Sequence, residues 1–326
     1  MNQLTVSVNQ ELALINEHER KKILFYMDKA RSISTKESYA EHLNKFLLTE
    51  SIPSTPARVA LWLIEQCENR LADEGQSYAK ATINLWLVAI RLAHLSQGFD
   101  DPTSNIIVRD VFEGLMRDYG KPQHQAKVLT SDEIFAMLAH CQSDNPIKDL
   151  RDKVLILIGY TGGFRINELL TLDCKQIFVS ENSRFDGYEI LMGKTKTDQR
   201  GEKGLKKLIP MTGKRSQPGL ILREWLRIVQ SGVLLRAVDK NGVLSPNRLS
   251  YTAALKILRD RAGAAKIKNA DLISTHSLRR SFVTNSYKNK KTNHQIAKQT
   301  HQSVATINRY IDDENVYENN PVFDVI

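Results

Sequence analysis

The sequence predicts a mainly helical protein with one small antiparallel β-sheet, organised as two domains. Apolar residues recur at helical intervals along most of the 326 residues. Strand-like alternation is confined to residues 187–210, where two runs predict a hairpin. Residues 119–127 hold glycine, proline and polar side chains, a composition typical of a linker. A chain of this length can form two separate cores, because a domain commonly takes ~100–200 residues.

The first domain, residues 1–120, is predicted to contain only helices. Ser34 and Glu37 have the spacing of a capping box, in which a hydroxyl and a carboxylate satisfy the free N–H groups of a helix start. Apolar residues at helical spacing then continue in four segments. These helices are expected to begin near Ser34, Val59, Ala79 and Ile107.

Residues 121–127 form the expected linker, and residues 128–326 the second domain. Thr130 and Glu133 make another capping box at its start. The hairpin is expected next, with its second strand at about residues 205–210. Helices are then expected to continue to about Glu314.

Composition favours a polyanionic partner for this chain. Lys and Arg outnumber Asp and Glu by 46 to 37, a net charge of +9, and the pI is near 9.3. Basic side chains that neutralise phosphates release condensed counterions, which drives binding to nucleic acid. Charge alone does not identify the partner, since many basic proteins never bind nucleic acid.

The three cysteines, Cys67, Cys141 and Cys174, have neither zinc-ligand spacing nor a disulfide framework. We expect reduced thiols in a cytoplasmic protein. Residues 1–10 lack a basic segment followed by an apolar core, so no secretory signal is expected. The longest apolar stretch is too short to cross a bilayer, and no membrane association is expected.

Four short segments of the second domain carry side chains suited to chemistry. In the first, the glycine pair Gly162-Gly163 ends a helix, and Arg165 opens the next one near N–H groups that favour an anion. Glu168 follows three residues later on the same helix face. Taken alone, this pair is more often an ordinary ion pair within a helix.

The second segment places Lys194 and Lys196 at the hairpin tip, where a lysine can act as a mobile charge and proton donor. In the third, His276 and Arg279 are three residues apart, a spacing that aims both at one point. Singly, both patterns are common on solvated surfaces.

The fourth segment contains His301 and, nine positions later, Tyr310. Ser303 between them is expected to cap the helix that carries the tyrosine. A half-buried structural tyrosine is the alternative when this segment is taken alone.

Together and in this order, the four segments resemble the active-site signature of the tyrosine recombinases, the phage integrase family. The Lys-Thr-Lys-Thr hairpin within Gly193–Thr197 is most similar to the Cre-type enzymes of that family. The resemblance covers nearly the whole chain. It implies an all-helical core-binding domain that clamps DNA, followed by a catalytic domain.

The resemblance also implies a role for each residue. Arg165 and Arg279 match the two catalytic arginines, and Glu168 the acid that supports the first. Lys196 matches the hairpin lysine, with Lys194 close enough to leave the assignment open. The remaining catalytic matches are His276, His301 and the nucleophile Tyr310. Thr300 stands where many members have glycine, a departure expected to alter local packing rather than chemistry.

By the same resemblance, the partner is double-stranded DNA with inverted-repeat recombination sites, bound by a homotetramer on two sites. The tail Asn315–Ile326 has apolar residues for docking into a neighbouring subunit, or onto its own core. No metal or other cofactor is expected: Glu168 and Asp173 do not make a two-metal set, and the glycine pair lacks the Gly-Lys-Ser/Thr ending of a phosphate loop.

Two other classes fit parts of this pattern. A DNA-binding regulator that no longer cuts would lack Tyr310 or an arginine, and neither is missing. A type IB topoisomerase would relax supercoils without site preference. Integration, excision, dimer resolution and inversion all use the same chemistry, and the sequence does not choose among them.

Overall fold

The computed structural model describes residues 15–120, 126–193 and 204–312. The chain forms two compact units, Met1–His124 and Gln125–Ile326. Over the described residues the structure is mostly helical with two small antiparallel sheets, which confirms the predicted fold class. None of the described helices is long and apolar enough to cross a membrane.

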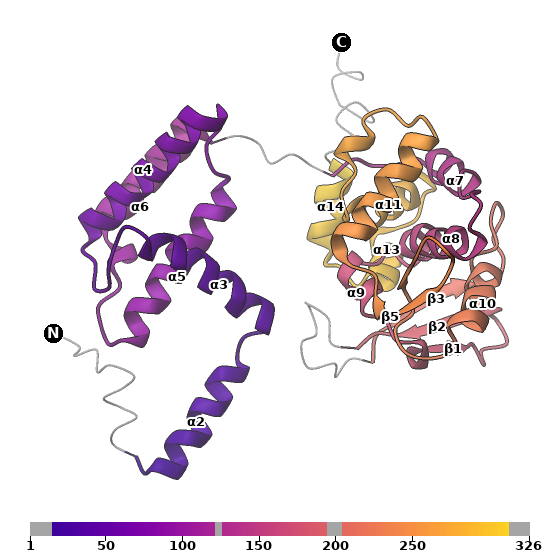
Figure 1. The fold of residues 1–326 in the computed structure, drawn as a ribbon, viewed down its shortest axis with the longest axis horizontal. Coiled ribbons are helices and arrows are strands. Elements are labelled where there is room, and N and C mark those ends of the chain that lie inside the picture. Colours follow the sequence, from indigo (N-terminus) through magenta and orange to yellow (C-terminus); the bar gives the residue numbers. More distant parts are fainter. Residues whose placement is uncertain (1–14, 121–125, 194–203, 313–326) are drawn as a thin grey trace. The chain divides into compact units, whose positions relative to one another are not determined.

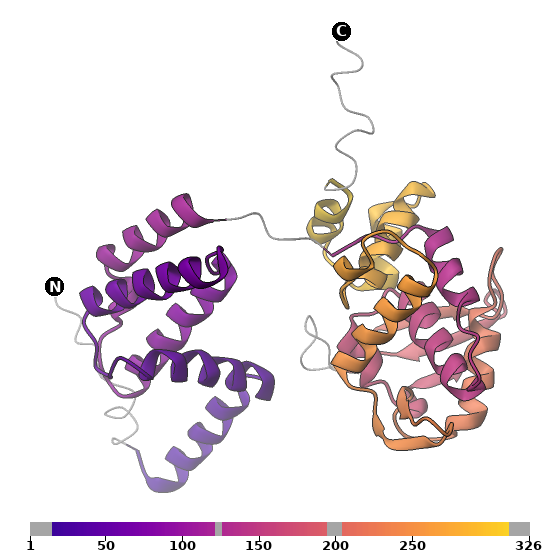
Figure 2. The same ribbon diagram turned by 45° about the horizontal axis from the view of Figure 1, so that its top comes forward.

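The first unit is built from helices alone within the described part of the chain. Helix α3 packs on α5, and α4 packs on α6, while α2 extends away from the other four (Figures 1 and 2). The helices are α2 Glu17–Lys29, α3 Ile33–Leu47, α4 Pro56–Glu74, α5 Lys80–Ser96 and α6 Ile106–Tyr119, with a short 3-10 helix, η1, at Pro102–Ser104.

Aromatic side chains form the centre of the first unit. Trp62 and Trp86 are almost completely buried, and their rings meet edge to face with centroids 5.1 Å apart. Phe46 contacts Trp62 in the same geometry. Such pairs stabilise a core beyond the apolar area they bury. This core is separate from that of the second unit.

The second unit combines helices with two small antiparallel sheets. Its helices and strands are α7 Ser131–Ala139, α8 Pro146–Thr161, α9 Ile166–Leu170, β1 Ile177–Val179, β2 Gly187–Leu191, β3 Lys206–Pro210, α10 Pro218–Val229, β4 Arg236–Val238, β5 Leu244–Arg248, α11 Tyr251–Ala264, α12 Ser277–Lys288, α13 Asn293–Thr300 and α14 Val304–Asp312. Two further 3-10 helices are η2 Cys174–Gln176 and η3 Ala270–Leu272.

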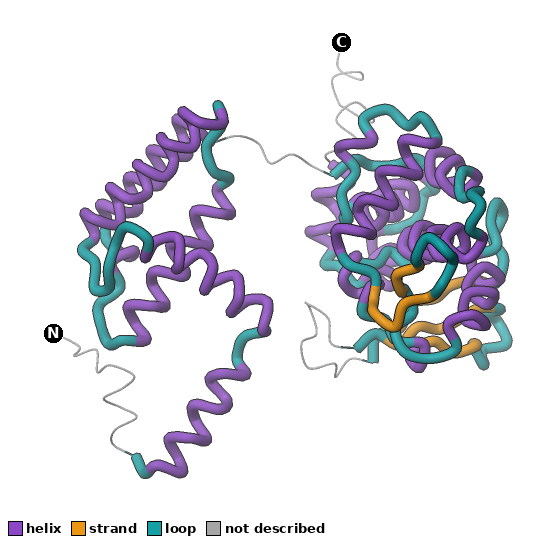
Figure 3. The backbone as a smooth tube through the Cα atoms, in the orientation of Figure 1, coloured by secondary structure: helices purple, strands orange, loops and turns teal. Residues whose placement is uncertain are grey.

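Strands β1, β2 and β3 pair antiparallel in that order, and β4 pairs with β5 in a separate two-stranded sheet. Figure 3 shows these strands gathered on one side of the unit. In the register of the first sheet, Ile190 of β2 lies opposite Ile177 and Lys207. The predicted hairpin is thereby confirmed for its described strands. Its tip, with Lys194 and Lys196, lies outside the described residues.

Helix α8 is the central helix of the second unit. Nearly all of its residues from Asp149 to Gly159 are buried, and it packs against α7, α10, α11 and α12. A helix buried on every side is apolar around most of its circumference, which explains the run from Val154 to Ile158. This helix ends immediately before the glycine pair.

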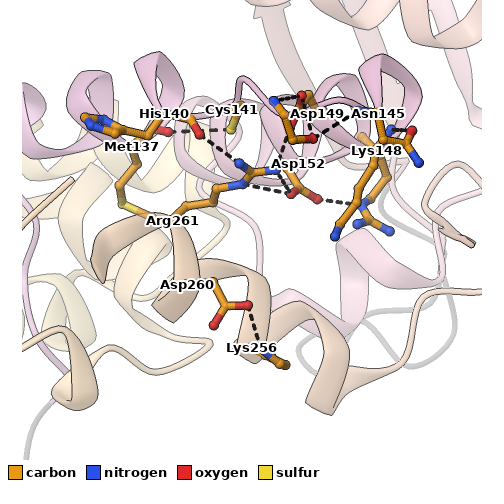
Figure 4. A network of polar contacts seen from close by, with 12 residues as sticks. Met137, His140, Cys141, Asn145, Lys148, Asp149, Asp152, Lys256, Asp260 and Arg261 are labelled. Atoms are coloured by element: carbon orange, nitrogen blue, oxygen red, sulfur yellow. Dashed lines mark hydrogen bonds and ion pairs between the residues drawn. The ribbon is translucent and has the colours of Figure 1, made fainter. Parts of the chain in front are cut away.

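A buried ionic network ties α8 to α11 (Figure 4). Arg261 donates to Asp149 Oδ1 at 2.6 Å and to Asp152 Oδ2 at 2.6 Å, and also to the carbonyl of His140 at 2.7 Å. Arg151 pairs with the other oxygen of Asp152 at 2.6 Å. Burying a charge is costly unless it is paired and hydrogen-bonded, and these carboxylates are both.

Two local predictions were wrong. Helix α3 is capped by Ser32, whose hydroxyl accepts from Thr35 N, rather than by Ser34. Both serines precede the same run of apolar residues, and a cap at Ser32 instead of Ser34 makes the helix longer. Strands were expected only within residues 187–210, but β1 and the β4–β5 hairpin lie outside that range. Strands β1 and β4 have three residues each, and β5 contains Pro246, so none of them alternates clearly. The Asn241-Gly242 pair between β4 and β5 is nevertheless a hairpin signal.

Other local predictions are confirmed. Thr130 and Glu133 form the expected capping box, and Ser303 caps α14 through its hydroxyl. Cys67 and Cys141 are buried free thiols, while Cys174 is half-buried. Burial raises the pKa of Cys141 to about 12, so this thiol is not a nucleophile at neutral pH. The tail Asn315–Ile326 lies outside the described residues.

Candidate active site

The glycine pair makes a turn that no larger residues could make. Helix α8 ends at Thr161, and Gly163 has a φ of +52°, a conformation that L side chains rarely adopt. A Cβ on Gly163 would lie 2.9 Å from a methyl carbon of Thr300, and one on Gly162 would lie 2.2 Å from the Phe164 ring. The missing side chains therefore let α13 approach the turn closely.

This turn delivers Arg165 to the N-cap of the short helix α9. Its backbone N–H donates to Glu168 Oε2 at 3.1 Å, and its guanidinium Nη1 donates to Glu168 Oε1 at 2.6 Å. The predicted pairing on one helix face is thus present. The Arg165 side chain keeps 23% of its surface exposed, so it can still reach an anion in solvent.

Arg279 reaches the same carboxylate from α12. Its Nη1 lies 3.8 Å from Glu168 Oε2, and its side chain is almost completely buried. The guanidinium also donates to the carbonyls of Gly163 and Thr300, each at 2.7 Å. Burial, and then the nearby charge of Arg165, lower its pKa to about 10, so it stays protonated at neutral pH.

His301 lies at the end of α13, in the left-handed conformation with a φ of +55°. Its Nε2 lies 3.0 Å from the carbonyl oxygen of Lys206. A carbonyl can only accept, so Nε2 carries the proton in this contact. Burial, and then the charge of Lys207, lower the pKa of His301, which favours the neutral ring.

Thr300, the departure from the family pattern, has a structural role in this arrangement. It is buried, its hydroxyl donates to Ile296 O at 2.9 Å, and its carbonyl accepts from Arg279. Its methyl group occupies the space that Gly163 leaves open. In this chain the threonine is accommodated by local packing.

Tyr310 lies on α14, half-buried against a small apolar cluster that includes Val283, Ile296 and Ile307. The Arg280 guanidinium lies 5.8 Å from the centroid of its ring, close enough for attraction between a cation and an aromatic face.

The structure brings together four of the residues predicted from sequence: Arg165, Glu168, Arg279 and His301. Arg165 and Glu168 lie more than 100 positions before Arg279 and His301 in the sequence. His276 is exposed at the N-cap of α12, three residues before Arg279. Among the described residues, no group of three or more His, Cys, Asp or Glu side chains is placed to hold a metal ion.

One residue of this region was not predicted. Lys207 lies on β3 with no exposed surface, and its ammonium lies among the backbone carbonyls next to Arg279. A signal for it exists in the sequence. Lys207 is two positions before Ile209, which places both on the inward face of the strand.

The fold and the site define a mainly helical protein with a cationic centre, in which two arginines lie beside one carboxylate and a histidine. The sequence pattern of the phage integrase family matches residues 127–315. The chain belongs to this family, the tyrosine site-specific recombinases.

Relatives match over most of the chain. An integrase/recombinase XerD homologue of Selenomonas ruminantium is 26% identical over 276 residues, which cover 82% of this chain and 76% of that protein. Tyrosine recombinase XerD of Staphylococcus aureus is 25% identical over 275 residues, covering 81% of this chain and 82% of that protein.

Solved structures share the fold. XerH site-specific recombinase, bound to difH substrate in a pre-cleavage complex, has a TM-score of 0.56 at 19% identity, covering 98% of this chain and 92% of its own. A lambda integrase dimer bound to a core site has a TM-score of 0.53 at 14% identity, covering 93% and 96%. The Cre-type resemblance within the family stays a prediction.

Proposed function

We propose that this chain is a site-specific DNA recombinase that cleaves and rejoins DNA through a 3′-phosphotyrosyl bond to Tyr310. The observation that carries the proposal is the convergence of Arg165 and Arg279 on the single carboxylate of Glu168, beside His301. Membership of the phage integrase family supports it, as do relatives that are named as recombinases.

The two arginines suit the charge that develops during cleavage. When a tyrosine oxygen attacks a phosphodiester, the pentavalent transition state carries extra negative charge on its equatorial oxygens. Guanidiniums remain charged at neutral pH and donate paired hydrogen bonds to such oxygens. Glu168 holds Arg165 by two contacts and lies near Arg279, so it keeps the two cations together.

The proton transfers are assigned by the family resemblance. A tyrosine hydroxyl ordinarily has a pKa of ~10, so it needs an acceptor at neutral pH. His276 takes the proton from Tyr310 as the new P–O bond forms. Lys196 gives a proton to the 5′ oxygen as its bond to phosphorus breaks. His301 donates a hydrogen bond to a non-bridging oxygen.

His301 must change its contacts to do so. Its Nε2–H is engaged with the Lys206 carbonyl, and the neutral ring has no second N–H. Donation to a phosphate therefore requires either rotation of the ring or a proton on Nδ1.

The covalent intermediate keeps the energy of the broken bond. Attack by a 5′ hydroxyl on the phosphotyrosine rejoins the DNA, and the reaction therefore requires no ATP. Exchange between two duplexes passes through a Holliday junction and calls for four subunits on two inverted-repeat sites. A lambda integrase tetramer bound to a Holliday junction shares this fold, with a TM-score of 0.53.

A covalent trapping assay tests this function. The full chain, a Tyr310→Phe variant and a Tyr287→Phe variant would be incubated with nicked DNA fragments from the region flanking the gene, then run on denaturing gels. Tyr287 is a suitable control because it packs in the same apolar cluster as Tyr310. We expect protein-linked DNA with the unmodified chain and with Tyr287→Phe, and none with Tyr310→Phe.

The other outcomes are equally informative. Adducts that persist in Tyr310→Phe would assign the nucleophile to another residue, with Tyr287 and Tyr317 as candidates. Sequence-specific binding without any adduct would favour a regulator that no longer cuts. Relaxation of supercoiled DNA without site preference would favour a topoisomerase.

A further inference from the structure

Lys207 is a fully buried cation whose three hydrogen-bond acceptors are all backbone carbonyls. Its Nζ lies 2.7 Å from Gly162 O, 3.3 Å from Gly163 O and 2.9 Å from Gln299 O. It also lies 4.8 Å from the centroid of the Phe164 ring. No carboxylate is among these hydrogen-bond partners, so the charge is held by peptide dipoles and one aromatic face.

These carbonyls belong to the two segments that lead to site residues. Gly162 and Gly163 form the turn that ends at Arg165, and Gln299 lies two residues before His301. Lys207 therefore connects the end of α8 to the end of α13 at a point close to the site.

A second set of contacts binds strand β3 to the same helix end. The side-chain amide of Gln299 accepts from Leu208 N at 3.2 Å and donates to Leu208 O at 2.8 Å, as a neighbouring strand would. It also donates to Thr161 O at 3.1 Å. These contacts hold Leu208, the residue next to Lys207, against the end of α13.

We propose that Lys207 is a positioning residue, whose ammonium fixes the turn that leads to Arg165 against the helix end that leads to His301. The catalytic part of this inference rests on the proposed function, because the geometry it fixes is that of the phosphate-binding centre. A lysine that only filled space in the core would not selectively hold these two segments together.

The three contacts require the charged form. An ammonium has three N–H donors for three carbonyls, whereas a neutral amine has two, and a carbonyl cannot donate to its lone pair. The titratable groups facing Lys207 are Arg279 on α12, Arg165 and Glu168 at the start of α9, and His301 at the end of α13. Three of these four groups are bases, and Glu168 is the one acid.

Burial, followed by the charge of Arg279, lowers the pKa of Lys207 to about 7. The full set of contacts is therefore present below about pH 7, and one contact is lost as the pH rises through that value. In the unfolded chain the lysine keeps its proton up to its ordinary pKa of ~10.4. The buried charge thus opposes folding below about pH 7, and this cost falls as the pH rises above it.

The test compares full-length Lys207→Met and Lys207→Gln with a Lys256→Met control. Methionine retains most of the side-chain volume without the charge, and glutamine retains two N–H donors. Lys256 is an exposed lysine of the same unit, paired with Asp260 at 2.7 Å. Circular dichroism and thermal melting identify any variant that fails to fold.

Hydrogen exchange is the first measurement, because it does not depend on cleavage. We expect Lys207→Met to exchange faster within residues 162–168 and 299–301, and to match the unmodified chain in α4 and α11. Unchanged exchange in those two segments would overturn the proposal. Equal acceleration across the whole second unit would also overturn it, since that is general destabilisation.

Single-turnover cleavage is the second measurement. We expect DNA affinity to stay unchanged and adduct formation by Lys207→Met to slow by about 100-fold near pH 6, a typical cost of misplaced catalytic groups. The ratio of unmodified to variant rates should fall as the pH rises to about 8.5, because the ammonium is lost.

The outcomes separate this inference from the proposed function. Faster exchange with normal cleavage, or a rate ratio that does not vary with pH, would overturn the positioning role. If the unmodified chain forms no adduct on DNA that it binds specifically, the proposed function fails, and the catalytic part of this inference fails with it. The exchange data would then still decide whether Lys207 holds the two segments.

Discussion

Glu168 shows how one acidic residue can organise a cationic site. Its two oxygens contact the backbone and side chain of Arg165, and Oε2 lies 3.8 Å from the Arg279 guanidinium. Two guanidiniums side by side repel each other, and the carboxylate between them reduces that repulsion. A phosphate that enters the site meets cations already held together, so less reorganisation is needed when charge develops.

At the scale of single residues, Arg165→Lys should greatly slow cleavage although it preserves the positive charge. A lysine is a single point donor and cannot reproduce the planar fork of the guanidinium. We expect adduct formation to slow by roughly 100-fold or more, the cost of removing one oriented donor from a transition state. Single-turnover trapping on DNA measures this change, with DNA affinity as the control. A near-normal rate of adduct formation would show that Arg165 is not a catalytic residue.

At the scale of elements, the contacts of Arg261 hold α11 against α8. Burial alone would raise the pKa of Asp149, but hydrogen bonds from Ser143 and Arg261 outweigh it and leave the pKa below its ordinary value. A depressed carboxyl pKa contributes stability above the ordinary value near 4, and this contribution is lost as the pH falls through the folded value.

Arg261→Met should therefore destabilise the second unit. Asp149 and Asp152 would remain buried without their main cation, at a cost of about 3–5 kcal/mol in the free energy of unfolding. The difference from the unmodified chain should be largest near neutral pH. It should shrink as the pH falls toward 4, because the unpaired carboxylates can then take up protons.

Urea denaturation followed by fluorescence and circular dichroism measures this effect. Lys256→Met provides the contrast, since Figure 4 shows the Lys256–Asp260 pair on the same helix α11. That pair is exposed, so its loss should change stability by less than about 1 kcal/mol. Equal effects of the two variants would contradict the assigned role of the buried network.

At the scale of the whole molecule, the net charge of +9 predicts DNA binding that weakens steeply with salt. Each neutralised phosphate releases counterions, so a protein with 6–10 phosphate contacts loses about 10³–10⁵ in affinity between 50 and 200 mM salt. We expect a loss in this range, measured by fluorescence anisotropy on a double-stranded fragment. Tyr310→Phe should show the same dependence of affinity on salt, since a phenol hydroxyl does not neutralise a phosphate. A flat salt dependence would contradict binding through the phosphate backbone.

Local signals accounted for most of the helices. Capping hydroxyls and apolar spacing act within a few residues, so they can be recognised directly in the sequence, as at Thr130 and Ser303. The β4–β5 hairpin was not predicted because β4 has only three residues and β5 contains Pro246, which interrupts a strand pattern. The predicted start of α3 was too late in the sequence, because a serine at either position 32 or position 34 can cap a helix.

The sequence by itself determined the fold class and the family, and it predicted Arg165, Glu168, Arg279, His301 and Tyr310 as site residues, because these depend on residue type and spacing along the chain. Only the tertiary structure decided that Arg279 is buried against two carbonyls, and that Lys207 joins the glycine turn to the end of α13. The physical reason is distance along the chain. Contacts between β3, the end of α8 and the end of α13 join segments from 44 to 138 positions apart, and no local pattern encodes which of them will meet.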